Sequence, residues 1–111
     1  CMDMADRKRS MIKNDLIRQL QSKGAATKYY LDLVEDYMFL YDQKEMLQKN
    51  IEENGAIVEY VNSRGIPSRK KNEACDMLLK TNMQMLKTLE FLRINPNDIV
   101  QVAKKDEEDE L

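Results

Sequence analysis

The stretch between Gly24 and Gly55 contains neither glycine nor proline, so it can form one long uninterrupted element. Thr27 is a suitable N-cap, so the sequence predicts a long helix from Lys28 to about Glu53 that ends at Gly55. Apolar side chains recur along this stretch at helical spacing and form its main apolar face: Tyr30, Leu33, Val34, Tyr37, Leu40, Tyr41, Leu47 and Ile51.

The same helix carries apolar residues on a second side, namely Leu31, Met38 and Met46. A helix with two apolar sides needs two packing partners, and in a chain of 111 residues one of them can be another subunit. The chain also has eight methionines, whose flexible side chains suit subunit contacts that tolerate repacking. We therefore expect a homo-oligomer whose interface includes Leu31, Met38, Met46, Tyr60 and Met83.

A shorter helix is predicted before the long one. Between Ser10 and Ser22, apolar residues recur at spacings of three and four, and Gly24 ends the pattern. Residues 1–9 are polar and basic and show no periodicity, so we expect them to form a flexible leader.

A β-hairpin is predicted after Gly55. Ala56 to Asn62 is rich in β-favouring residues, residues 62–65 have the composition of a turn, and residues 66–69 can return as a second strand. Pro67 restricts that return to an edge strand. Isolated two-stranded hairpins are marginally stable, so this one must pack on helices or on neighbouring copies.

A third helix is expected from about Lys71 to Leu92, with a buried stripe of Ala74, Leu78, Met85, Leu89 and Leu92. The run Asn95-Pro96-Asn97-Asp98 breaks this helix and can open a final turn through Val102. Five consecutive acidic residues at 106–110 predict a disordered tail.

Together these patterns predict a mainly α protein. It has a short N-terminal helix and two long antiparallel helices with an intervening short β-hairpin, and it ends in a disordered acidic tail. The expected organisation is a flexible basic leader at 1–9, a single helical domain at 10–103 and the acidic tail at 104–111.

Composition argues against several classes of protein. Histidine is absent, which rules out histidine-based acid–base catalysis and metal ligation. Two cysteines cannot make a disulfide scaffold or a four-thiolate zinc site. No glycine-rich phosphate loop, activated nucleophile or metal-spaced carboxylate set is present, so we expect no enzyme and no cofactor. Without a long apolar run or signal peptide, we expect a cytoplasmic protein with no membrane partner.

The distribution of charge points to nucleic acid. The net charge is +4 over residues 1–30, -5 over 31–55 and +3 over 56–72, within a chain of net charge -2. Contact with a polyanion must therefore be local, and each neutralised phosphate would release counterions. The hairpin return contributes Arg64, Arg69, Lys70 and Lys71 as candidate DNA-binding residues, although a merely soluble loop is an equal alternative. The N-terminal segment contributes a second group: Arg7, Lys8, Arg9, Lys13 and Arg18.

Two other functions are compatible with these patterns. The first helix, the turn at Ser22–Ala26 and the long helix resemble a helix-turn-helix, so residues 10–45 could act as a dimeric DNA-binding regulator. A structural adaptor without nucleic-acid contact is the other alternative.

The order of features resembles a known family. Lys28-Tyr29-Tyr30-Leu31-Asp32-Leu33-Val34-Glu35-Asp36-Tyr37 opens a long helix, and Ile51-Glu52-Glu53-Asn54-Gly55 leads into a β segment. Lys71-Asn72-Glu73-Ala74 then opens a helix that ends in Leu89-Glu90-Phe91-Leu92-Arg93-Ile94-Asn95-Pro96. Over about residues 14–99 this pattern is similar to the phage terminase small subunits often found in prophages of Gram-positive bacteria. Many of those proteins have Asn-Pro-Ala at the positions of 72–74 and Leu-Gly-Leu-Thr-Pro at those of 92–96.

The resemblance implies a non-enzymatic component of viral genome packaging in the host cytoplasm. Such proteins assemble into rings, recognise double-stranded viral DNA near the packaging start, and regulate the large terminase subunit, which holds the ATPase and nuclease. For this chain it implies a homo-oligomer that contacts DNA phosphate through the two basic groups.

Overall fold

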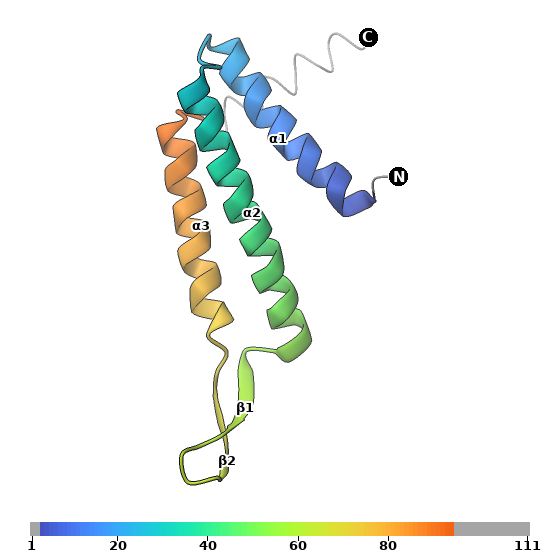
Figure 1. Cartoon of the computed structure of the whole chain (residues 1–111), viewed down its shortest axis with the longest axis vertical. Coiled ribbons are helices and arrows are strands. Elements are labelled where there is room, and N and C mark those ends of the chain that lie inside the picture. The colour runs from blue at the N-terminus through green and yellow to red at the C-terminus, as the bar shows by residue number, and fades with distance from the viewer. Residues whose placement is uncertain (1–2, 95–111) are drawn as a thin grey trace. The chain divides into compact units, whose positions relative to one another are not determined.

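The computed structural model describes residues 3–94 of the chain. Within this range the chain forms three helices and one two-stranded sheet (Figure 1). The elements follow in the order α1 (Met4–Ser22), α2 (Lys28–Asn54), β1 (Ile57–Val61), β2 (Pro67–Lys71) and α3 (Ala74–Phe91). The mainly helical architecture with a short antiparallel hairpin confirms the predicted fold class. The predicted final turn at 98–102 and the acidic tail at 104–111 lie outside the described residues.

The chain divides into two compact units. One comprises Cys1–Phe39 and Leu86–Leu111, of which residues 3–39 and 86–94 are described, and the other comprises Leu40–Met85. The predicted single domain at 10–103 contains parts of both units. In the second unit the C-terminal half of α2 leads into the hairpin and the N-terminal half of α3 leads away from it, so the two segments run in opposite directions (Figure 1).

Helix α1 begins earlier than the sequence predicts. It starts at Met4 instead of Ser10, so residues 4–9 are helical and the expected flexible leader is wrong for them. The Asp3 carboxylate caps the helix by accepting a hydrogen bond from the Asp6 N–H at 2.8 Å. A capped run of good helix formers needs no apolar periodicity to stay helical, and apolar periodicity was the only signal that placed the start at Ser10.

The hairpin has a regular antiparallel register. Ile57 lies opposite Lys71, Glu59 opposite Arg69, and Val61 opposite Pro67. The predicted return strand at 66–69 therefore extends further, through Lys71, and α3 starts three residues later than predicted. Gly65 closes the turn with a φ of 76°, a left-handed conformation that favours glycine.

Backbone hydrogen bonds flank the ladder at both ends. The Asn62 N–H donates to the Ile66 carbonyl at 3.0 Å, and the Asn72 N–H donates to the Ala56 carbonyl at 2.8 Å. Hydrogen-bonded and non-hydrogen-bonded pairs alternate in an antiparallel ladder, and Pro67 occupies a non-hydrogen-bonded position. At such a position the backbone N–H of any other residue would point away from β1, so the lack of an N–H in proline leaves the pairing intact. Proline therefore costs the hairpin no internal hydrogen bond.

The two units have separate sets of buried side chains. In the first unit the fully buried residues are Leu20, Val34, Met38 and Leu92, contributed by α1, α2 and the turn after α3. In the second unit Tyr41, Ala74, Thr81 and Met85 are buried. Predicted stripe residues Ala74, Met85 and Leu92 are thus confirmed as core, although Leu92 lies one residue beyond α3.

Met38 is buried inside its own chain, with no exposed surface. The sequence assigned it to a subunit interface because it lies off the main apolar face of α2. Instead, α1 supplies Leu20 and the turn after α3 supplies Leu92 to the core of the unit in which Met38 is buried. Of the other predicted interface residues, Met46, Tyr60 and Met83 are exposed and Leu31 is half-buried.

Helix α3 ends in a tight C-terminal motif. The Arg93 N–H donates to the Glu90 carbonyl and the Ile94 N–H donates to the Leu89 carbonyl, each at 3.0 Å. Arg93 has a φ of 57°, the left-handed conformation usually taken by glycine at this position. Within residues 3–94, none of the three helices combines the length and the apolar character that a membrane span requires.

Candidate nucleic-acid interface

The four basic residues of the hairpin are all exposed, and its register distributes them over two faces. Arg69 and Lys71 share one face with Glu59, which lies directly opposite Arg69. Lys70 projects from the other face, and its ammonium group lies 5.1 Å from the ring centroid of Tyr60. Arg64 lies in the turn between the strands. The predicted cluster is therefore exposed but does not form one continuous basic face.

Two acidic residues at the start of α3 form ion pairs with the two lysines of β2. The Lys71 Nζ lies 2.7 Å from Asp76 Oδ2, and the Lys70 Nζ lies 3.8 Å from Glu73 Oε1. The hydrogen bond and the charge of Asp76 raise the pKa of Lys71. The Lys71–Asp76 pair links β2 to the first turn of α3. The helix macrodipole also favours an acidic residue in this first turn.

Arg64 and Arg69 differ from the two lysines because neither forms an ion pair with any residue in the described part of the chain. Their guanidinium groups are exposed and can donate hydrogen bonds to phosphate oxygens without first breaking an internal pair. Among the four hairpin residues, these two are the stronger candidates for DNA contact.

Helical geometry separates the five basic residues of α1. Arg7 and Arg18 lie on one exposed stripe together with Met11 and Asn14, at spacings of three and four. Lys8 is exposed beside this stripe. Arg9 and Lys13 are half-buried on the other side of the helix. The structure therefore brings Arg7, Lys8 and Arg18 to a common surface and does not bring Arg9 and Lys13 to it.

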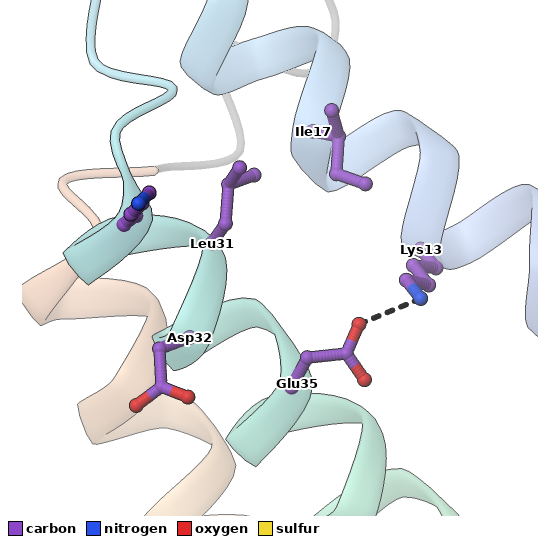
Figure 2. A pocket seen from close by; sticks show the side chains of 6 residues that line it. Lys13, Ile17, Leu31, Asp32 and Glu35 are labelled. Carbon is purple, nitrogen blue, oxygen red and sulfur yellow. Dashed lines mark ion pairs between the residues drawn. The ribbon is translucent and has the colours of Figure 1, made fainter.

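Lys13 and Arg18 each take part in an ion pair on the unit's surface. The Lys13 Nζ lies 2.6 Å from Glu35 Oε1 and links α1 to α2 (Figure 2). The Arg18 guanidinium lies 2.9 Å from Asp15 Oδ1 within α1. Lys13 therefore has a structural role in this unit, whereas Arg7 and Lys8 form no ion pair within residues 3–94.

An open groove of about 380 Å³ lies between α1 and α2 (Figure 2). Ile17 and Leu31 form its apolar part, and Lys28, Asp32 and the Lys13–Glu35 ion pair also line it. Its few polar groups do not converge on an enclosed space, as a small-molecule site would require. No group of side chains in the described range has the composition of a metal site.

Asn14 is a candidate contact that the sequence analysis missed. It lies on the stripe between Arg7 and Arg18, and asparagine can form paired hydrogen bonds with an adenine edge. Its spacing of seven from Arg7 and four from Arg18 would have revealed it, had the helix been predicted to start at Met4. The turn at residues 23–27 joins α1 to α2, as in the predicted helix-turn-helix.

The family comparison extends beyond this surface to nearly the whole chain. The model of the family described as "Phage terminase, small subunit" matches residues 5–109. No curated protein and no solved structure gives a significant match.

Proposed function

The chain belongs to the phage terminase small subunit family, and from this premise we propose that it oligomerises, binds double-stranded viral DNA and regulates the large terminase subunit. The observation that carries this proposal is the family match over residues 5–109. Membership supports a role in phage DNA packaging, and small terminase subunits are generally not catalytic. We propose that the protein acts in the host cytoplasm and that it is encoded by a prophage of a Gram-positive bacterium.

The distribution of exposed charge supports DNA contact at two places. On the hairpin, Arg64 and Arg69 are exposed and not ion-paired, and on α1 the same holds for Arg7 and Lys8. Each phosphate neutralised at these positions would release counterions and contribute salt-dependent affinity. Arg18 and Asn14 extend the α1 surface along the helix. We assign α1 and the hairpin as two phosphate-contacting surfaces of one DNA-binding protein.

Most contacts from such surfaces are to the sugar–phosphate backbone, which fixes register and orientation but carries little sequence information. We therefore expect specificity to depend mainly on DNA shape and on the geometry of the assembly. The stripe on α1 is the surface from which direct base contacts would come, because its Arg and Asn side chains have the donor and acceptor groups for base edges.

DNA binding can be tested by fluorescence anisotropy with a labelled duplex from the packaging region. We expect replacement of Arg64, Arg69, Lys70 and Lys71 by alanine to weaken binding by at least tenfold at moderate salt. The matched control replaces Lys28, Lys49, Lys80 and Lys87, which are exposed, so that the same charge is lost elsewhere. Equal affinity of the hairpin variant and the wild type would remove the hairpin from the DNA-binding site.

The other candidate function, a dimeric helix-turn-helix regulator, is favoured by the α1–turn–α2 arrangement. Footprinting distinguishes the two functions. A regulator protects one operator with two half-sites, whereas a packaging protein of the proposed kind binds with a steep salt dependence and broad sequence tolerance. Co-purification with the large subunit tests the partner, and a peptide covering residues 104–111 tests whether the acidic tail forms that contact.

A further inference from the structure

The hairpin consists of two strands that have no third strand beside them in the described chain. Most of its side chains are exposed, including the apolar residues Ile57, Val61 and Ile66. Two strands alone are marginally stable in water, whereas three or more with an apolar face are stable. The hairpin therefore has two free edges and apolar surface that an added strand would cover.

The ladder geometry identifies the main-chain groups on each edge. Because the pairs 62–66 and 56–72 are hydrogen-bonded, the alternating residues of β1 that face β2 are Val58 and Tyr60. The N–H and C=O groups of Ile57, Glu59 and Val61 point outward from β1. On β2 the outward residues are Pro67, Arg69 and Lys71, and Pro67 offers only its carbonyl.

The two edges differ in charge. The outward residues of β1 carry one negative charge, that of Glu59, between two apolar side chains. Those of β2 carry two positive charges, and Lys71 is already paired with Asp76. Neither Glu59 nor Arg69 forms an ion pair in residues 3–94, although they lie opposite each other. Both charges are therefore available to a neighbouring strand on the same face of the sheet.

We propose that the β1 edge of one copy pairs antiparallel with the β2 edge of the next copy, with Glu59 of the first opposite Arg69 of the second. The inference rests on the proposed homo-oligomer and specifies its interface. In the assembled protein Arg69 serves this subunit contact, and Arg64 in the turn remains the unpaired hairpin residue for DNA. All outward groups of Ile57 and Glu59 then find partners, and Val61 donates its N–H to the carbonyl of Pro67 in the neighbour. Glu59 and Arg69 alternate across the extended sheet as a ladder of opposite charges.

Charge disfavours the symmetric alternatives centred on Glu59 or Arg69. Pairing β1 with a second β1 about Glu59 places two carboxylates opposite each other. Pairing β2 with a second β2 about Arg69 places two arginines opposite each other and brings two prolines, which lack an N–H, into the new ladder. Only head-to-tail pairing matches opposite charges. Such an interface is heterologous, so it repeats from copy to copy and generates a closed ring when the rotation closes.

The test uses two charge-reversal variants, Glu59→Arg and Arg69→Glu, with mass measured by light scattering after size-exclusion chromatography. Each variant alone places like charges at every interface, so we expect the concentration for half-assembly to rise roughly tenfold. An equimolar mixture restores opposite charges at every interface of an alternating assembly, and we expect near wild-type assembly. Recovery in the mixture supports head-to-tail pairing. Unchanged assembly of either variant alone, or no recovery in the mixture, overturns it.

Glu59→Pro supplies an independent test of the main-chain contact. The Glu59 N–H points outward, at a position of the ladder equivalent to that of Pro67. Proline at 59 therefore removes the edge donor without removing a hydrogen bond of the hairpin. We expect loss of assembly with unchanged helical circular dichroism, whereas Glu59→Gln keeps the donor and assembles better than the proline variant. Full assembly of Glu59→Pro would show that β1 is not the interface.

Failure of this proposal is distinguishable from failure of the proposed function. Arg64 lies in the turn, outside the paired strands, so Arg64→Ala should weaken DNA binding and leave the mass unchanged. A wild-type chain that binds packaging DNA as a monomer would overturn the pairing and leave DNA binding intact. An assembled chain without DNA binding would overturn the DNA assignment alone.

Discussion

The side-chain amide of Asn72 donates a hydrogen bond to Asn50 Oδ1 at 3.0 Å and so joins the end of β2 to α2. The same amide donates to the Gly55 carbonyl at 2.9 Å, and Asn72 Oδ1 accepts from the Ala74 N–H at 3.0 Å. Asn72 is buried, with 7% of its surface exposed. One side chain therefore connects α2, the hairpin and the first residue of α3. In the Asn72-Glu73-Ala74 motif of the family resemblance, asparagine thus closes the turn that opens α3.

Asn72→Ala is expected to destabilise the fold by about 2–4 kcal/mol, because it removes three hydrogen bonds and leaves buried groups unsatisfied. Chemical denaturation followed by circular dichroism measures the change. Gln43→Ala, at an exposed position of α2, should change stability by less than about 0.5 kcal/mol. An equally small effect at Asn72 would show that the junction is held by other contacts.

Met38 and Met46 form a matched pair on α2, with 0% and 73% of their surfaces exposed. Met38→Ala should cost about 2–5 kcal/mol of unfolding free energy, since it leaves a cavity in the core. Met46→Ala should leave that free energy nearly unchanged. If Met46 forms part of a subunit contact, its loss will weaken self-association in light scattering. Equal stability of the two variants would contradict the burial of Met38.

Arg93→Gly is expected to stabilise the protein by about 0.5–1 kcal/mol. Arg93 has a φ of 57°, which costs a non-glycine residue about 1–2 kcal/mol, partly offset by the greater freedom of glycine in the unfolded chain. Lys23 Nζ donates to the Arg93 main-chain carbonyl, and the substitution keeps that acceptor. Arg93→Ala is the control, because it removes the same side chain but keeps Cβ. Thermal melting that ranks alanine above glycine would refute this account.

Stability should fall at alkaline pH. Burial raises the pKa of Tyr37 from its ordinary value of 10.0, and Asp76 raises that of Lys71 from 10.5. Above these ordinary values the unfolded chain loses protons that the folded chain retains, so the stabilisation present at lower pH is lost as pH rises through the folded pKa values. Melting temperatures between about pH 9 and 11.5 should fall less steeply for Tyr37→Phe than for the wild type. Tyr29→Phe, at a position with 71% of its surface exposed, is the control and should match the wild type.

Arg7 and Lys8 should each contribute to the salt dependence of DNA binding. Replacing either by alanine should reduce the slope of log K against log salt by about 0.9, the value for one phosphate contact. Lys80→Ala, which removes an exposed lysine of α3, should leave the slope unchanged. Slopes that are the same for all three variants and the wild type would exclude α1 from phosphate contact.

Local sequence signals were sufficient for the elements themselves. Helical spacing from Tyr30 to Ile51 predicted α2, and Gly55, β-favouring residues and Pro67 predicted the edge hairpin. These predictions succeed because they depend on backbone geometry and on neighbours only a few residues away. The start of α1 was missed because a polar run carries no apolar periodicity, although the Asp3 cap was present in the sequence.

The candidate surfaces required the tertiary structure. Sequence identified the basic residues, yet only the fold paired Lys13 with Glu35 and Lys71 with Asp76 and left Arg64 and Arg69 unpaired. It also buried Met38 and left Met46 exposed, although both lie off the main apolar face of α2. Spacing along a helix determines which side a residue occupies, but what covers that side depends on segments far away in the chain. Signals along the chain are therefore enough to predict most of the elements and their charges, whereas the packing of distant segments settles which residues remain free to bind.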